Sequence, residues 1–447
     1  MSKKLSFLLV LSVLAAAVVP NIVLADSGEG TSPEHQVLQD RPIQLGTSGG
    51  NINDRSSLYC CSGTLGALVE DGVNQYILSN NHVLALSNHG IIGDGINQPG
   101  QTDQGCGQKG IVAYLSDFET IRFKKGRRIP INTIDAAIAL VVEGAVDPNG
   151  RILDIGQISS ETTIAQLDQA VQKSGRTTGH TKGIVTDISF SGYVGYSKEC
   201  GGPSNQLAWF DNQIMIEDTN EVFSAGGDSG SLIVEDTADA RAVGLLFAGS
   251  STHTLANPID DILGTFGVVM AGGATSPPPP PTLTGAITGI VTNSSTGQLI
   301  DGADVSTDTG QSAVTQDGLY LLSDVPTGDR QVTASFEGLR DKTQTVTVVA
   351  DDTTVADFAL KVRKGGGGRG KPNTGAIHRA LKAKNSHIHR FMDIDGVVGA
   401  GVGLSAKGQP VVRVYLSQDS KKVKSQLPSK VDGVPVVTIV TGTFEAF

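Results

Sequence analysis

The 447-residue sequence has little charge, and its charge is mainly acidic. Charged residues make up only 18% of the chain, and the formal net charge is −11. Because such a chain repels a polyanion, we expect no nucleic-acid partner. Glycine, by contrast, is abundant with 56 residues. Little charge and much glycine favour turn-rich β structure over helical bundles, and the length predicts two to four domains.

Long hydrophobic runs are also scarce, and the one at the start of the chain is short. Leu5 to Val19 is a mainly apolar run of 15 residues, and Lys3 and Lys4 precede it. A helix that crosses a bilayer needs about 20 residues, so a membrane anchor is the weaker alternative. The run and the "VLA" at 23–25 predict a signal peptide over residues 1–25. We therefore expect a secreted, periplasmic or cell-surface protein without a transmembrane anchor after cleavage.

Cysteine is scarce too, with four residues and no CxxC pair among them. Structural zinc sites usually contain such pairs, so zinc is the weaker alternative, and we expect no metal and no cofactor. In an exported protein disulfides are permitted. The adjacent Cys60 and Cys61 suit a mutual disulfide poorly, so one is expected to pair with Cys106 and the other with Cys200. Which pairs with which stays open.

Changes in composition divide the chain. Between residues 41 and 270, short apolar runs alternate with Gly and Asn, which predicts many short strands in a sandwich or barrel. Five prolines, Pro277–Pro281, then form a stiff spacer. The predicted units are a signal peptide (1–25), a polar segment (26–40), a β domain (41–270), a Pro-rich linker (271–282), a β-sandwich (283–361), a basic Gly-rich linker (362–390) and a small C-terminal α/β domain of unknown role (391–447).

The two regions after the proline spacer carry no catalytic pattern. The segments "GIVT" (289–292), "LIDGADV" (299–305) and "TQDGLYLL" (315–322) resemble the carboxypeptidase regulatory-like module, a small prealbumin-like β-sandwich. That resemblance implies a spacer or adhesion unit. Residues 361–390 hold nine Lys and Arg and no acid. This segment is either a contact to an anionic cell surface or a solvated linker and helix face, and we favour the second.

Three residues in the β domain suit nucleophilic catalysis, which needs a nucleophile, a base and an acid that orients the base. Ser229 lies in "GGDSGSLIV", where flanking glycines permit unusual backbone conformations. His82 follows an apolar strand in "YILSNNHVLA". Asp135 opens the apolar run "AAIALVV", where an ionised carboxylate is costly unless it is paired. The alternatives are a hairpin turn, a structural histidine and a strand-capping aspartate.

The order His82, Asp135, Ser229 is that of chymotrypsin and differs from those of subtilisin and the α/β-hydrolases. Residues 41–270 resemble a trypsin/chymotrypsin-like serine protease of the bacterial secreted type. The resemblance rests on "YCCSGTLGALV", "LSNNHVLA", "DAAIAL", "SGRTTGHTKG", "GGDSGSLIV" and "VGLLFAGSSTHT". It implies two six-stranded β-barrels with the site between them.

The resemblance also implies roles for single residues. His82 would act as general base and then general acid, Asp135 would orient it, and Ser229 would form the acyl-enzyme. The oxyanion hole would consist of the N–H groups of Gly227 and Ser229. The substrate-binding residues would be Phe223 at the base of the specificity pocket and Phe247, Ala248 and Gly249 along the substrate strand. A neutral, bulky residue at the pocket base argues against a preference for basic side chains and favours small or apolar ones. His253 is a weaker candidate for contact with an acidic side chain.

Two features of the digestive relatives are missing. No "IVGG" occurs in residues 26–50, so the partner of Asp228 stays open, and no cysteine follows His82. The function we expect is a secreted serine endopeptidase that acts on proteins or peptides. The alternatives are a catalytically silent protease-like fold that acts as a surface binding or adhesion protein, and a protease that mainly processes its own chain.

Overall fold

A computed structural model describes residues 32–218, 222–271, 284–308, 311–336, 339–350, 352–362 and 374–446. The predicted signal peptide and all but the first residue of the Pro-rich linker lie outside these ranges. Within them, no helix combines the length and hydrophobicity that a membrane crossing would require. In the predicted polar segment, a short 3-10 helix, η1 (Pro33–His35), places His35 in a buried position, where its ring contacts the carbonyl of Gly46 and the carboxylate of Asp154.

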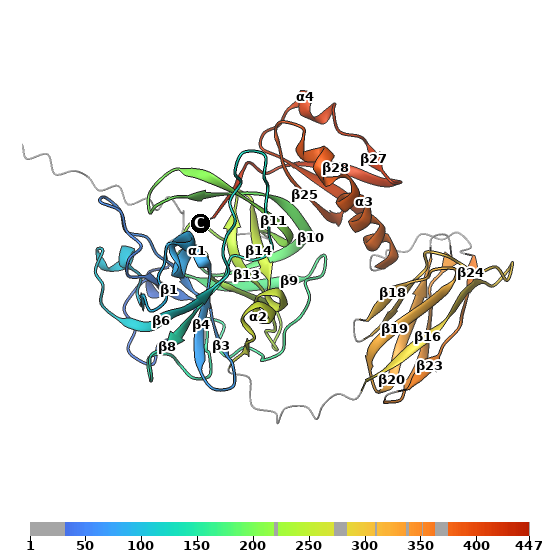
Figure 1. The fold of residues 1–447 in the computed structure, drawn as a ribbon, viewed down its shortest axis with the longest axis horizontal. Helices are drawn as coiled ribbons and strands as arrows, with labels where there is room; N and C mark the ends of the chain where they lie inside the picture. Colours follow the sequence, from blue (N-terminus) through green and yellow to red (C-terminus); the bar gives the residue numbers. More distant parts are fainter. Residues whose placement is uncertain are drawn as a thin grey trace, which may run out of the picture.

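The first part of the β domain is a closed barrel (Figure 1). Its strands are β1 (Thr47–Asn51), β2 (Gly63–Leu65), β3 (Ala67–Glu70), β4 (Gln75–Ser79), β5 (Gly95–Asn97), β6 (Ile111–Phe118) and β8 (Ala137–Val141). They pair in the order β3-β4-β8-β6-β5-β1-β2. Since β2 and β3 are one segment interrupted at Gly66, the last strand leads back to the first and the sheet closes. The short β15 (Val269–Met270) pairs with β3.

The second part is a six-stranded barrel. Its strands are β9 (Ala170–Gly175), β10 (Gly179–Ser197), β11 (Ser204–Asp218), β12 (Leu232–Glu235), β13 (Ala242–Gly249) and β14 (His253–Pro258). They follow the order β10-β9-β12-β13-β14-β11, and the pairing of β10 with β11 closes the ring. Buried and more exposed residues alternate along the first half of β10, the period expected of a strand with one face on a core.

Short elements connect these strands. They are α1 (Asn81–Leu84), η2 (Leu86–Asn88), η3 (Gln101–Gln104), β7 (Ile131–Asn132), which pairs with β11, and α2 (Ile259–Phe266), which follows β14. The two barrels confirm the mainly β, chymotrypsin-like fold that the sequence predicts for this region. The cleft between them is where the candidate site lies.

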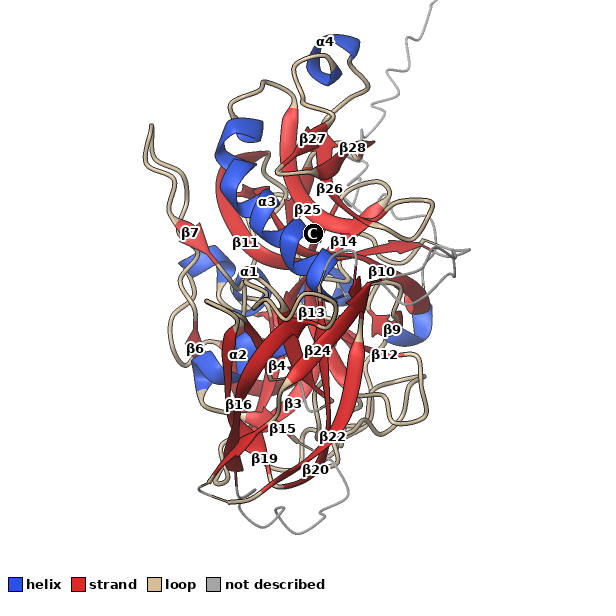
Figure 2. Cartoon of the chain, turned by 90° about the vertical axis from the view of Figure 1, so that its right-hand side faces the viewer, coloured by secondary structure: helices blue, strands red, loops and turns tan. Residues whose placement is uncertain are grey.

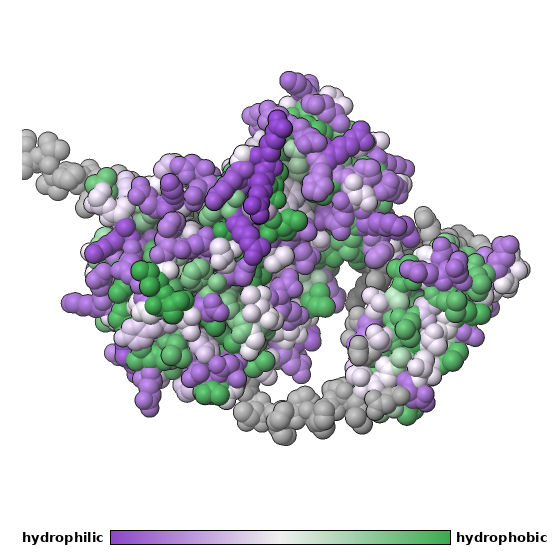
Figure 3. Space-filling view, viewed as in Figure 1, coloured by the Kyte–Doolittle hydropathy of each residue, from purple (hydrophilic) through white to green (hydrophobic). Residues whose placement is uncertain are grey.

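Residues 284–362 form a β-sandwich, as the sequence predicts. One sheet contains β16 (Thr284–Asn293), β19 (Leu319–Pro326), β21 (Leu339–Arg340), β23 (Thr353–Val355) and β24 (Phe358–Val362). The other contains β17 (Asp304–Thr307), β18 (Ser312–Val314), β20 (Gly328–Ser335) and β22 (Lys342–Val348). The buried side chains between the sheets all come from this unit. In the space-filling view the sandwich stands beside the barrels with an opening between them (Figure 3).

The last unit joins the second barrel. It contains α3 (Thr374–Met392), β25 (Val397–Leu404), β26 (Pro410–Leu416), α4 (Lys421–Lys424), β27 (Lys430–Val431), β28 (Val434–Val440) and β29 (Phe444–Ala446). Strand β25 pairs antiparallel with β10, so the sheet of this unit continues the sheet of the barrel. Figure 2 shows α3 lying across this sheet, and its buried Ala380, Ala383 and Phe391 share a core with β25 and β26.

The basic linker predicted for residues 362–390 is therefore too long. From Thr374 onward the chain is helical, and the small C-terminal domain begins there and not at 391. The lysines and glycines of the segment suggested a linker, but apolar residues recur every three or four positions after residue 376 and bury one face of the helix. Even Lys384 is buried, and its Nζ donates to the hydroxyl of Ser191 on β10 at 2.7 Å.

Candidate functional site

His82 and Asp135 meet on the first barrel at the edge of the cleft. His82 lies in α1, directly after β4, and Asp135 lies just before β8, which pairs with β4. The distance between His82 Nδ1 and Asp135 Oδ2 is 2.6 Å, and the backbone N–H of His82 donates to Asp135 Oδ1 at 3.2 Å. Asp135 is fully buried, whereas 10% of the His82 side chain stays exposed. The carboxylate therefore fixes the orientation of the ring through Nδ1.

Asp135 has a second donor that sequence analysis missed. The hydroxyl of Tyr196, on β10 of the second barrel, donates to Asp135 Oδ2 at 2.8 Å. Asn257 accepts from the backbone N–H of Asp135 at 3.0 Å, and Asn80 donates to its carbonyl at 2.7 Å. The hydroxyl of Tyr196 thus satisfies a carboxylate that burial would otherwise penalise, and the two asparagines satisfy the backbone of Asp135. Burial and the adjacent carboxylate raise the pKa of Tyr196 well above its usual range, so the phenol keeps its proton.

Ser229 lies in the loop before β12, on the second barrel. Gly227 and Gly230 both have positive φ angles, +95° and +94°, which glycine adopts without strain. The carbonyls of Gly227 and Ser229 accept hydrogen bonds from Thr64, whose hydroxyl and N–H are the donors. Within the described ranges, the N–H groups of Gly227 and Ser229 donate to no acceptor. Two neighbouring donors without a partner suit the stabilisation of an oxyanion.

The loop touches the first barrel closely. A Cβ at Gly66, the break between β2 and β3, would lie 1.9 Å from the carbonyl oxygen of Gly230. Only glycine can stand there, because any side chain would push the loop away. Ser229 itself is fully buried, and its hydroxyl donates to the carbonyl of Phe247 on β13 at 3.2 Å. The nucleophile loop is thus fixed between β13 and the barrel that carries His82.

Asp228, whose partner the sequence left open, binds a buried lysine. Its Oδ2 lies 3.6 Å from Lys173 Nζ, and both side chains are fully buried. The backbone N–H groups of Thr177, Thr178 and Ala225 also donate to the carboxylate, at 2.8, 3.2 and 3.0 Å. Burial lowers the pKa of Lys173, and the charge of Asp228 opposes the decrease. Lys173 is therefore the partner of Asp228 that the sequence left open. A lone lysine inside the strand "AVQKSG" was the signal that could have revealed it.

A cavity of about 440 Å³ opens beside His82. Its wall includes Asp54, His82, Tyr196 and Ala446. Burial raises the pKa of the Asp54 carboxyl to about 7, and the nearby His82 opposes the increase. The cavity thus holds a second acid that changes charge near neutral pH, which sequence analysis did not single out.

Two disulfides secure this side of the site, Cys60–Cys106 and Cys61–Cys200. The expectation that each adjacent cysteine reaches one distant partner is confirmed, and the fold decides the pairing. Asp54, Cys61 and Cys200 have ligand atoms within 4.8 Å of one another. Both sulfurs are committed to the disulfide, so this cluster lacks the thiolates that a metal would need.

Of the predicted substrate-binding residues, Phe247, Ala248 and Gly249 lie along β13. Phe247 is buried against Phe210, with ring centroids 4.7 Å apart. Its main chain and not its ring therefore faces the cleft. Ala248 and Gly249 pair with β29 of the C-terminal unit. The predicted substrate strand is therefore already paired with a segment of the same chain.

The predictions for Phe223 and His253 need correction. The ring of Phe223 is fully buried in the core of the second barrel, where Gly183 leaves room for it, and it does not line the cleft cavity. Its bulk fills the barrel instead of forming a pocket base. His253 is buried against Tyr415 of the C-terminal unit, with ring centroids 6.2 Å apart. Burial and Arg413 lower its pKa to about 4.

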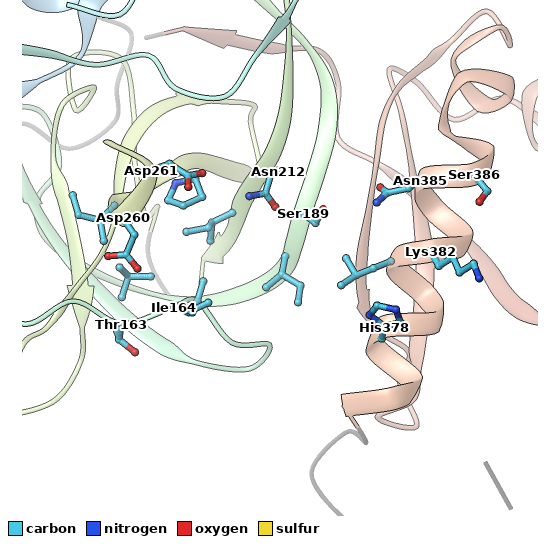
Figure 4. A pocket seen from close by; sticks show the side chains of 17 residues that line it. Thr163, Ile164, Ser189, Asn212, Asp260, Asp261, His378, Lys382, Asn385 and Ser386 are labelled. Atoms are coloured by element: carbon cyan, nitrogen blue, oxygen red, sulfur yellow. The ribbon is translucent and has the colours of Figure 1, made fainter. Parts of the chain in front are cut away.

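Another cavity, of about 980 Å³, lies between α3 and the second barrel (Figure 4). His378, Lys382 and Asn385 project from α3 on one side, and Asp260 and Asp261 lie on the barrel side. None of the candidate catalytic residues lines it. His82 borders the smaller cavity instead.

Models of two protein families match parts of the chain. A model of the carboxypeptidase regulatory-like domain matches residues 286–361, and a model described as the Nal1 C-terminal domain matches residues 111–257. The β-sandwich is thus a carboxypeptidase regulatory-like domain, as its sequence predicts. A comparison with curated protein sequences gave no match.

The solved structures similar to this chain include several serine proteases. A glutamic acid-specific serine protease, described as using a histidine triad in substrate binding, is 21% identical, with 51% of this chain and 100% of that chain covered and a TM-score of 0.35. Thermobifida fusca protease A is 17% identical, with 52% of this chain and 99% of that chain covered and a TM-score of 0.34. Cellulomonas bogoriensis chymotrypsin is 18% identical, with 52% of this chain and 98% of that chain covered and a TM-score of 0.32.

Proposed function

We propose that the chain is a secreted serine endopeptidase in which His82, Asp135 and Ser229 form the catalytic triad. The observation that carries the proposal is the 2.6 Å contact between His82 and the buried Asp135, at the mouth of a cavity. A buried carboxylate beside a partly exposed histidine is the arrangement that a general base requires. The nucleophile loop with its two unpaired N–H donors supports the same chemistry.

The reaction follows from these groups. Ser229 Oγ attacks the scissile carbonyl carbon while His82 Nε2 takes the hydroxyl proton. The negative oxygen that forms receives hydrogen bonds from the N–H groups of Gly227 and Ser229. His82 then gives its proton to the leaving amine, and water releases the acyl group by the same steps in reverse. Asp135 stabilises the charged imidazole, and Tyr196 orients Asp135 by donating to its carboxylate.

The proposed location is outside the cytoplasm. The signal peptide predicted over residues 1–25 supports export, and two disulfides suit an oxidising compartment. The proposed partners are protein or peptide substrates that bind in the cleft. The carboxypeptidase regulatory-like domain would serve as a spacer or adhesion unit.

An active-site probe tests the proposal. A fluorophosphonate labels a serine only when a base activates it, so Ser229 is expected to react. Since β29 covers part of the substrate strand, the probe is offered to the full chain and to a variant that ends at Gly442. Ser229→Ala should abolish labelling, and Ser312→Ala, an exposed serine of the sandwich, should not. If neither the full chain nor the shortened variant reacts while both are folded, the proposed activity is wrong.

A further inference from the structure

Strand β29 (Phe444–Ala446) leaves the C-terminal unit and joins the sheet of the second barrel at the cleft between the two barrels. It pairs antiparallel with β13, where Ala446 lies opposite Ala248 and Glu445 lies opposite Gly249. On its other side it pairs in parallel with β10, where Phe444 lies opposite Val194. A three-residue strand paired on both sides has its main chain sequestered in the sheet.

The strand runs toward the catalytic residues. As the chain passes from Glu445 to Ala446, its partner on β13 changes from Gly249 to Ala248, toward Phe247. The carbonyl of Phe247 accepts the hydroxyl of Ser229, the proposed nucleophile. Ala446 also lines the same cavity as His82 and Tyr196.

The segment is held by its side chains as well. Phe444 is 2% exposed and packs edge-on against Phe190, with ring centroids 5.1 Å apart. The carboxylate of Glu445 accepts the hydroxyl of Ser204 at 3.0 Å. Just before the strand, Gly442 has a φ of +80°, which lets the chain turn out of β28 toward the cleft. The anchor, the turn and the pairing all direct residues 444–446 into one position.

The unit that carries the segment is fastened to the barrel. Lys384 donates to Ser191 at 2.7 Å, and Arg413 binds the buried Asp187 at 2.8 Å. Ser191 and Asp187 both lie on β10. A segment attached to a docked unit competes with any free peptide at a high effective concentration, on the order of millimolar. Its affinity need not be high for it to stay in place.

We propose that residues 444–446 of this chain are a resident occupant of the edge of β13 beside β10, the edge at which the proposed function places the substrate. The inference rests on the proposed function. A peptide substrate would add to the same sheet edge through its main chain, as peptides do in β-augmentation. Residues 444–446 therefore act as a competitive inhibitor within the chain, and cleavage requires that they leave the cleft.

The test compares variants that lose or keep the segment. One variant ends at Gly442. A second, Glu445→Pro, keeps the Phe444 anchor but removes a backbone donor from the middle of the strand. Glu445→Gln is the matched control, because it keeps that donor. We expect the first two to react with a fluorophosphonate and to cleave casein at least about tenfold faster than the full chain and the control. A synthetic peptide of residues 441–447 should inhibit the shortened variant, and a scrambled peptide should not.

The outcomes separate the two proposals. If the full chain and both variants label Ser229 at equal rates, the occupant does not inhibit, and the proposed protease activity stands. If folded variants and full chain all fail to label, the activity itself is wrong. Hydrogen exchange on the full chain tests the inference without any substitution. Slow exchange at Glu445, Ala446 and Gly249 is expected, and exchange of all three within seconds would overturn the inference.

Discussion

The two units that follow the barrels differ in how they relate to the cleft. The sandwich of residues 284–362 pairs its strands only with one another and buries its own core. The unit of residues 374–446 adds its sheet to the barrel, shares a core with Trp209 and sends β29 into the cleft. The sequence presents both as appended modules. An appended unit thus becomes part of the barrel domain when it pairs with one of that domain's strands.

Strand β10 is where that difference arises. Along its length, Asp187 binds Arg413, Ser191 accepts from Lys384, and Val194 lies opposite Phe444. Near its end, Tyr196 donates to Asp135 of the proposed triad. One strand thus contacts the C-terminal unit, the proposed inhibitory segment and the catalytic acid. The sandwich contributes no strand to this sheet.

The largest expected effect comes from breaking the ion pair that fastens the C-terminal unit. In Arg413→Met the buried Asp187 loses its partner, and a buried charge left alone costs about 3–5 kcal/mol of unfolding free energy. Burial already raises the pKa of Asp187 to about 6, against the influence of Arg413. Urea unfolding measures the loss, which we expect in the barrel transition and not in that of the sandwich.

Lys182→Met is the matched control for that change. Lys182 forms an ion pair with Asp236 at 2.8 Å, on the same barrel but at the surface. Exposed pairs contribute about 0–1 kcal/mol, so a small change is expected. Equal losses in the two variants would show that the C-terminal unit is not anchored through Asp187.

The next effect concerns the contact from β10 to the catalytic acid. Tyr196→Phe removes the hydroxyl that donates to Asp135 and keeps the ring. Hydrogen bonds to charged groups contribute about 1.5–3 kcal/mol, which corresponds to a decrease in kcat/KM of about 10–100-fold. The acid limb of the pH–rate profile should shift as well, because the substitution changes the surroundings of His82, the proposed base.

The sandwich offers the control for this substitution. In Tyr320→Phe a hydroxyl that donates to the carbonyl of Ala356 is lost, far from the cleft in the separate core. The variant should keep full activity. An unchanged kcat/KM in Tyr196→Phe would mean that Tyr196 only packs and does not position Asp135.

A smaller effect is expected from Asp54, which lines the cavity beside His82. Its pKa of about 7 lies above the unfolded value, so the folded protein binds more protons between about pH 4 and 7, and wild-type stability falls as the pH rises through that range. Asp54→Asn should flatten this dependence and add about 1–2 kcal/mol at pH 7, since solvent access limits the effect. Thermal unfolding at several pH values measures it.

Asp71→Asn provides the comparison for that measurement. Asp71 lies in an exposed turn, where hydrogen bonds lower its pKa to about 2. It stays ionised over the same pH range, so its substitution should leave the slope unchanged. Parallel curves for wild type and Asp54→Asn would contradict the prediction.

The smallest effect should follow from removing the sandwich. Replacing residues 284–362 with a flexible Gly/Ser linker leaves every strand of both barrels and of the C-terminal unit in place. Changes in barrel stability should stay within about 0.5 kcal/mol, and kcat/KM for a small peptide should be unchanged. A large loss of either would show that the sandwich supports the cleft, and would remove the distinction between the two units.

Local sequence patterns predicted much of the fold and part of the candidate site. Alternating apolar residues predicted the barrels, and the sandwich was found from its turn and strand segments. Asp135 drew attention because a carboxylate beside a buried strand must have a partner, and it lies 2.6 Å from His82. Phe223 was misplaced because its position in the chain says nothing about the side of the loop on which its ring lies. Lys173 and Tyr196 were missed because their partners lie 55 and 61 residues away.

Neighbouring residues are sufficient to predict the kinds of strands, the order His82, Asp135, Ser229 and the glycines that shape the loop around Ser229. Contacts between distant segments pair Cys60 with Cys106, bring Lys173 to Asp228 and place residues 444–446 in the cleft. Strand pairing uses main-chain groups that every residue has. A three-residue segment that joins a distant sheet edge therefore leaves no local mark, and only the assembled barrel creates the edge that it occupies.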